Sequence, residues 1–214
     1  ERLGIADNTL VIVTSDNGPW FEGSPGRLRG RKGQSYEGGF RVPCLAWWPG
    51  QIPAGAVVDA PTMLIDLFPT CMRLAGIELP TDRVIDGTDI WPLLSGQTKT
   101  LPERALFYFH EYDVEGMRLG RWKYLRAISH YCWPVPLDKK DNLAGQMSSG
   151  YNYSPPGSDK SVPTLGTWPL LYDLRQDPGE CYNLADKYPE VAERMGKRLD
   201  AWRAGFYENP RGWQ

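Results

Sequence analysis

Residues 9–19 have the sequence Thr9-Leu10-Val11-Ile12-Val13-Thr14-Ser15-Asp16-Asn17-Gly18-Pro19, and they indicate the fold class. The apolar and β-branched run up to Thr14 predicts a strand buried on both faces in a parallel sheet. Turn-forming residues follow it directly. Asp16 and Asn17 are therefore expected at the carboxyl end of a buried strand, the edge at which open α/β sheets bind ligands.

The remainder of the first hundred residues supports an α/β arrangement. Residues 42–48 form a second apolar run, closed by Pro49-Gly50. Residues 61–75 have apolar side chains at three- and four-residue steps, which predicts a helix that stops at Gly76. Strand, helix and strand in alternation predict a mixed sheet with flanking helices over residues 1–100.

Beyond residue 100 the pattern changes to short strands separated by turns, which predicts a small antiparallel sheet. The expected strands are 105–109, 116–119, 122–125 and 170–174. A long loop is expected over residues 130–168, which are rich in Pro, Ser, Gly and Asn. An amphipathic helix follows from Pro189 to Trp202. Residues 101–214 are thus predicted to form a second, smaller subdomain.

Composition and charge argue against some classes of function for this protein. The net charge of −2 argues against nucleic-acid binding, which needs a basic surplus. The sequence contains no apolar run of the roughly 18–20 residues that span a bilayer. Four cysteines permit zero, one or two disulfides. The chain starts without a signal peptide and enters a strand at once, so we expect a fragment whose uncovered strand edge promotes self-association.

Two neighbouring features indicate chemistry. Asp16 and Asn17 offer hard oxygen ligands suited to Ca²⁺ or Mg²⁺, although Asp-Asn-Gly is also a common turn. A glycine-rich segment follows, and it places five cations within fifteen residues: Arg27, Arg29, Arg31, Lys32 and Arg41. Glycine lets backbone approach a ligand and lysine supplies a point charge to an anion. The segment is consistent with an anion-binding loop or with a solvated basic loop.

These motifs resemble the second signature region of the sulfatases, specifically those of the arylsulfatase type in the alkaline-phosphatase-like superfamily. The residues that carry the resemblance are Thr14-Ser15-Asp16-Asn17-Gly18, Leu28-Arg29-Gly30-Arg31-Lys32-Gly33-Gln34-Ser35-Tyr36-Glu37-Gly38-Gly39-Phe40-Arg41-Val42-Pro43, and Leu170-Leu171-Tyr172-Asp173-Leu174 with Asp177-Pro178-Gly179-Glu180. The resemblance covers nearly all of the chain except about residues 130–168. It implies the C-terminal part of an alkaline-phosphatase-like sheet, followed by the small antiparallel sheet and the terminal helix.

The resemblance also implies roles for individual residues. Asp16 and Asn17 correspond to two ligands of an active-site Ca²⁺, and Lys32 to the lysine that binds the sulfate group and stabilises charge during ester cleavage. The other motif residues, including Glu37 and Arg41, are expected to have structural roles, as glycine-permitted backbone and buried pairs.

The nucleophile that the family requires is not found in this sequence. Sulfatases use a formylglycine made from a Cys/Ser-x-Pro-x-Arg motif, and the nearest candidate, Cys132-Trp133-Pro134-Val135-Pro136, has proline where arginine is needed. His110 and His130 follow the Lys32 motif, so the catalytic histidine of the family maps onto neither. The chain is therefore expected to be inactive alone, with formylglycine supplied by residues that precede it.

The resemblance implies a sulfate-ester substrate, either an aryl or a carbohydrate sulfate. It also implies that the parent enzyme is secreted, periplasmic or lysosomal. Two alternatives stay open at this stage. One is a phosphoesterase of the same superfamily, which would use two transition metals with histidine ligands. The other is a non-catalytic module that binds anions or glycans.

Overall fold

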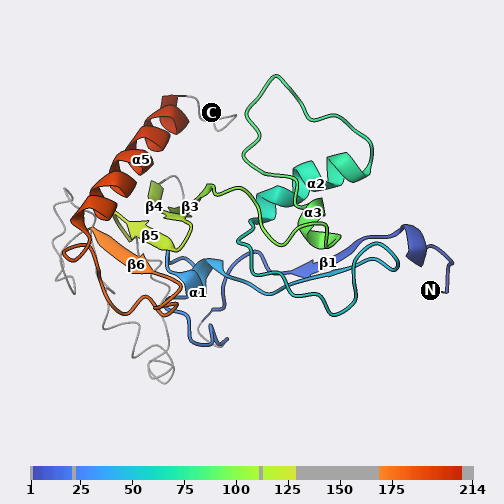
Figure 1. The fold of residues 1–214 in the computed structure, drawn as a ribbon, viewed down its shortest axis with the longest axis horizontal. Coiled ribbons are helices and arrows are strands. Elements are labelled where there is room, and N and C mark those ends of the chain that lie inside the picture. The colour runs from blue at the N-terminus through green and yellow to red at the C-terminus, as the bar shows by residue number, and fades with distance from the viewer. Residues whose placement is uncertain (1, 21–22, 111–112, 129–168, 209–214) are drawn as a thin grey trace. The chain divides into compact units, whose positions relative to one another are not determined.

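The computed structural model describes residues 2–20, 23–110, 113–128 and 169–208 (Figure 1). These residues form two compact units, which are described separately. One unit contains residues up to Asp16 and Pro43–Glu103, and the other contains Asn17–Val42 and the residues from Arg104 onward. The expected loop 130–168, with His130 and Cys132, lies outside the described residues.

The first unit is built on a two-stranded sheet. Its elements are η1 (Ala6–Asn8), β1 (Val11–Thr14), β2 (Cys44–Trp47), η2 (Leu64–Asp66), α2 (Leu67–Leu74) and α3 (Trp91–Leu94). The prediction of a parallel strand buried on both faces is wrong for this chain. β1 pairs antiparallel with β2, with Val11 opposite Trp47, and Val13 is 58% exposed. The apolar run correctly marked the strand, but an apolar pattern does not specify the direction of the neighbouring strand.

α2 matches the expected helix but begins later than the apolar pattern suggested. The carboxylate of Asp66, fully buried, accepts hydrogen bonds from the backbone N–H of Met63 at 2.7 Å and of Thr88 at 2.9 Å. The first of these contacts fixes the turn that leads into α2. Gly76, with φ of +68°, takes the left-handed conformation that ends the helix.

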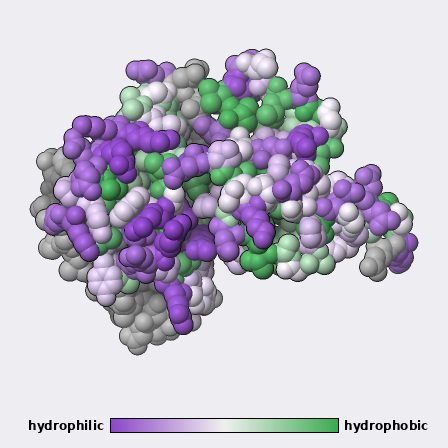
Figure 2. Space-filling view, in the orientation of Figure 1, coloured by the Kyte–Doolittle hydropathy of each residue, from purple (hydrophilic) through white to green (hydrophobic). Residues whose placement is uncertain are grey.

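Large apolar side chains of this unit reach the surface. On the sheet, Val11 and Val13 of β1 lie opposite Trp47 and Leu45 of β2, and all four are exposed. The same holds for Phe68 on α2, which is 47% exposed. Figure 2 shows hydrophobic residues at the surface over this unit.

The second unit contains a four-stranded antiparallel sheet with the strand order β3-β4-β5-β6, as expected from the sequence. Its strands are β3 (Ala105–His110), β4 (Asp113–Leu119), β5 (Trp122–Leu125) and β6 (Leu170–Asp173). The predicted C-terminal helix is confirmed as α5 (Pro189–Glu208). One further helix, α1 (Glu37–Phe40), lies in the segment expected to be a loop. It was missed because one turn containing two glycines shows no helical periodicity.

The two faces of this sheet are covered by different parts of the chain (Figure 1). Val191, Met195 and Leu199 of α5 pack on one face, in a core with Met117 and Leu171. On the opposite face a second core joins residues of β5, β6 and the glycine-rich segment. Its members are Tyr36, Leu125, Ala127, Ile128, Leu170, Tyr172 and Leu174. The glycine-rich segment is thus part of the hydrophobic core of the C-terminal sheet.

Two expectations from composition bear on the described residues. Cys44, Cys71 and Cys181 are free thiols and all three are exposed. Within the part of the chain that the structure describes, no helix is long and apolar enough to cross a membrane.

Candidate functional site

The backbone at Gly18 and that of the glycine-rich segment pack against each other at very short interatomic distances. Gly18 donates its N–H to the carbonyl of Gly39 at 2.8 Å. A Cβ built on Gly18 would lie 1.8 Å from the Gly38 carbonyl oxygen, and one on Gly38 would lie 2.5 Å from the Arg29 carbonyl oxygen. Side chains are excluded at these positions, which explains why the sequence needs glycine there.

Lys32 lies on the outside of this packed segment. Its backbone N–H donates to the Pro19 carbonyl at 3.1 Å, whereas its side chain is exposed. Within the described residues, no hydrogen bond or ion pair engages its ammonium group. A fixed backbone with an uncommitted cation is suited to binding an anion.

The neighbouring arginines have different roles. Arg31 is buried, and its guanidinium donates to the carbonyls of Trp20, at 2.6 Å, and of Gly23. Arg29 lies over the ring of Tyr36, 4.3 Å from its centroid, and donates to the Glu180 carbonyl at 2.7 Å. The guanidinium groups of these two arginines stabilise the fold of the segment, a role that the Lys32 ammonium does not share. The expectation of a merely solvated basic loop is therefore wrong for Arg29 and Arg31.

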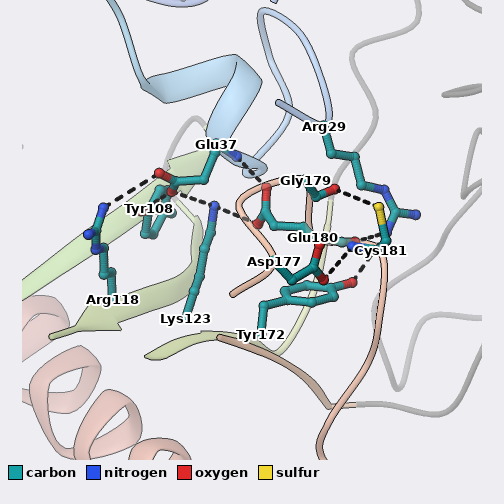
Figure 3. Close-up of polar contacts among 10 residues, drawn as sticks. All are labelled: Arg29, Glu37, Tyr108, Arg118, Lys123, Tyr172, Asp177, Gly179, Glu180 and Cys181. Carbon is teal, nitrogen blue, oxygen red and sulfur yellow. Dashed lines mark hydrogen bonds and ion pairs between the residues drawn. The ribbon is translucent and has the colours of Figure 1, made fainter. Parts of the chain in front are cut away.

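α1 is attached to the C-terminal sheet by a buried polar cluster (Figure 3). Lys123 of β5 is fully buried, and its Nζ lies 3.1 Å from Glu37 Oε1 and 2.9 Å from Glu180 Oε1. The Tyr108 hydroxyl donates to Glu37 Oε1 at 2.6 Å, and an Arg118 nitrogen lies 3.6 Å from Glu37 Oε2. The structural role expected for Glu37, as one partner of a buried pair, agrees with this geometry.

The cluster shifts the pKa values of its two carboxyl groups, Glu37 and Glu180, in opposite directions. Burial by itself would raise the pKa of Glu37, but Lys123 and the Tyr108 hydroxyl outweigh it and the pKa is lowered. For Glu180, burial dominates over the attraction of Lys123 and raises the pKa to about 7. Glu37 is thus the carboxylate that remains ionised beside Lys123 and Arg118.

Asp16 and Asn17 follow the carboxyl end of β1 after one intervening residue, Ser15, as the sequence predicted. The Asp16 side chain is exposed, and its Oδ1 lies 3.4 Å from the Ser15 hydroxyl, which donates to it. Asn17 is half-buried and precedes the tightly packed Gly18. Among the described residues, no group of three or more His, Cys, Asp or Glu side chains is arranged to hold a metal ion.

His110 was considered in the sequence and set aside as a catalytic residue, but its position near Lys32 was not predicted. It ends β3, and its Nδ1 lies 3.1 Å from the carbonyl oxygen of Gly33, the residue after Lys32. Lys123 was also missed, although the alternation along β5 contained a signal. Lys123 shares a strand face with Leu125, which is fully buried.

The described residues combine helices with two antiparallel sheets, and the glycine-packed segment of the second unit presents an exposed lysine, Lys32. Comparison with protein families identifies the class of protein. The sulfatase family model matches residues 1–77, and the model described as the C-terminal region of aryl-sulfatase matches residues 101–211. The chain belongs to the sulfatase family.

Individual relatives cover the chain almost completely. Steryl-sulfatase of Mus musculus is 38% identical over 94% of the chain, which corresponds to 32% of that protein. Arylsulfatase A of Homo sapiens is 38% identical over 94% of the chain and 39% of its own length. The chain thus spans 32% to 39% of the length of these relatives.

Among solved structures, the PsFucS1 sulfatase from Pseudoalteromonas sp. superimposes with a TM-score of 0.74. It is 27% identical, and the match covers 98% of this chain and 40% of that one. The predicted fold class, the C-terminal part of an alkaline-phosphatase-like fold with a small antiparallel sheet and a terminal helix, is confirmed.

Proposed function

We propose that this chain is part of a sulfuric ester hydrolase in which Lys32 binds the sulfate group of the substrate. The observation that carries the proposal is the contrast between Lys32 and its neighbours. Arg29 and Arg31 are committed to structural contacts, whereas the Lys32 ammonium is exposed on a backbone fixed by close glycine packing. Family membership favours a sulfate ester over a phosphate ester as its ligand.

The role of Lys32 follows from electrostatics. Negative charge grows on the oxygens of a sulfate ester as the ester bond breaks. A cation held in place before the reaction stabilises the transition state, in which this charge is larger, more than it stabilises the bound ester. It therefore lowers the activation free energy of ester cleavage. Because neighbouring contacts fix the backbone of Lys32, only side-chain freedom is lost when the ammonium meets its anion.

Asp16 and Asn17 are proposed to contribute to a Ca²⁺ site. A carboxylate and a side-chain amide are hard oxygen donors of the kind that Ca²⁺ prefers, so the donor chemistry fits. Two residues supply only part of the roughly six to eight ligands that Ca²⁺ takes, so the chain alone is expected to bind it weakly. When bound, the ion would act as a Lewis acid toward sulfate oxygens.

The chain alone is proposed to be inactive. Residues 1–214 contain no Cys/Ser-x-Pro-x-Arg motif from which the formylglycine nucleophile of the family could be made. Hydrolysis through a covalent sulfated intermediate therefore requires residues from outside this chain. The proposed substrate class is an aryl or carbohydrate sulfate, and the proposed compartment of the parent enzyme is secreted, periplasmic or lysosomal.

Two assays on the chain test this proposal. In the first, para-nitrophenyl sulfate is incubated with the chain and no turnover is expected. In the second, the amide resonances of Lys32 and Gly33 are followed during titration with inorganic sulfate. We expect weak saturable binding that Lys32→Ala abolishes and that Lys99→Ala, a change at an exposed lysine elsewhere, preserves. Equal sulfate binding by wild type and Lys32→Ala would contradict the role of Lys32.

A further inference from the structure

Lys123 is an unusual residue for the centre of a small sheet. Its side chain is fully buried, and its Nζ lies 3.9 Å from the centroid of the Tyr108 ring. A lysine is rarely buried completely, because removing its charge from water is costly unless close partners compensate. Here the compensation comes from Glu37 and Glu180, at 3.1 and 2.9 Å.

Those two partners come from segments far apart in the sequence. Glu37 begins α1, while Glu180 follows β6. They are also joined directly, because the backbone N–H of Glu37 donates to Glu180 Oε2 at 2.6 Å. Lys123 therefore lies where the glycine-rich segment, β5 and the turn after β6 meet.

The turn that presents Glu180 adopts a costly conformation. Glu180 has a φ of +50°, and among the described residues it is the one non-glycine residue with a positive φ. Such a conformation persists where the surroundings over-determine it. At Glu180 the carbonyl accepts from Arg29 at 2.7 Å, and the carboxyl group meets Lys123 and the Glu37 amide.

A displacement of α1 would be transmitted to Lys32. The Gly38 N–H donates to the Arg29 carbonyl at 2.6 Å. A Cβ on Gly39 would lie 2.6 Å from the Arg31 carbonyl oxygen, so α1 and the residues beside Lys32 pack backbone against backbone. Aromatic packing holds both ends of α1, because Tyr36 before it enters the hydrophobic core and the Phe40 ring lies 5.0 Å from that of Tyr108. The polar contacts of Glu37 add the buried link between α1 and the C-terminal sheet.

We infer that Lys123 is a positioning residue for Lys32: by holding Glu37 and Glu180 together, it fixes α1 on the C-terminal sheet and thereby orients the anion-binding lysine. This inference deepens the proposed function and rests on it for the role of Lys32. The C-terminal sheet then has a part in the reaction without touching substrate.

The test compares Lys123→Met with wild type by amide hydrogen exchange and by titration with inorganic sulfate. We expect exchange at Lys32, Gly38 and Gly39 to accelerate by about tenfold or more and sulfate affinity to fall, with α5 still protected. Lys197→Met, a change at an exposed lysine of α5 paired with Glu193, is the matched control and should alter neither property.

A second variant keeps the test decisive if Lys123→Met fails to fold. In Lys123→Met/Glu180→Gln the cation and one carboxyl group are removed together, and Glu37 retains Arg118 and Tyr108. The same loss of protection and of sulfate affinity is expected. Unchanged exchange and affinity in the folded variant would overturn the inference, and so would an equal loss of protection in α5, which would make Lys123 a general core residue.

The two proposals fail in different ways. If wild type and Lys32→Ala bind sulfate equally, the role of Lys32 is refuted. Exchange at Gly38 and Gly39 would still report whether Lys123 fixes the segment.

Discussion

Replacing Gly18 by alanine is expected to disrupt the segment that carries Lys32. The new Cβ would lie 1.8 Å from the Gly38 carbonyl oxygen, whereas real Cβ atoms essentially never approach within 3.0 Å, so the backbones must separate by about 1.2 Å (3.0 − 1.8). Adding one methyl group to a packed interior typically costs about 1–3 kcal/mol. We expect a value near 3 kcal/mol, because the opposing atoms are backbone and the Gly18–Gly39 hydrogen bond is lost as well.

Urea unfolding of the chain, combined with amide hydrogen exchange, measures this effect. The matched control is Gly205→Ala in α5, where a Cβ meets nothing within 4 Å. Because alanine favours a helix interior over glycine, this control is expected to stabilise the chain by about 0.5–1 kcal/mol. A Gly18→Ala variant as stable as wild type, with unchanged exchange at Gly38 and Gly39, would refute the close packing on which the site depends.

Three further outcomes are expected. Asp66→Ala should destabilise the first unit by about 2 kcal/mol, because it leaves two partly buried backbone N–H groups without their acceptor. Urea unfolding of this variant against Asp59→Ala, a change at an exposed residue, would measure the loss. Burial raises the pKa of Glu180 from 4.5 to about 7, so the stability that its protonated form contributes is complete below pH 4.5 and is lost as the pH rises through 7. Glu180→Gln should flatten the free energy of unfolding over this pH range, and an unchanged pH dependence would contradict the raised pKa. Calorimetry of the chain with Ca²⁺ should show weak binding that Asp16→Ala removes, whereas tight binding unaffected by that change would contradict the partial site.

Much of the fold of the C-terminal unit could be predicted from local sequence. Alternating apolar residues marked β3 to β6, and helical spacing marked α5, because these patterns depend on which side chains face the core. α1 and α3 were missed, since each is one turn long and contains glycine or proline. The pairing direction of β1 could not be predicted, because it depends on which strands lie beside it.

The candidate site was predictable in part. Asp16, Asn17 and Lys32 were identified from motifs, and their roles stay predictions. The contact of Lys123 with Glu37 joins residues 86 positions apart, and the hydrogen bond between Glu37 and Glu180 joins residues 143 positions apart. No local pattern reports such separations. The lysine also resembled a solvent-facing strand residue, since charged side chains are seldom fully buried.

The most direct test is a rate measurement on a longer protein that contains this chain together with a Cys/Ser-x-Pro-x-Arg motif. Hydrolysis of para-nitrophenyl sulfate by that protein would be compared with hydrolysis by its Lys32→Ala and Lys99→Ala variants. We expect Lys32→Ala to lower kcat by about 10²–10³, the loss typical of one preorganised charge-stabilising group, and Lys99→Ala to leave kcat unchanged. Full activity of Lys32→Ala would contradict the assignment of Lys32 to the sulfate group.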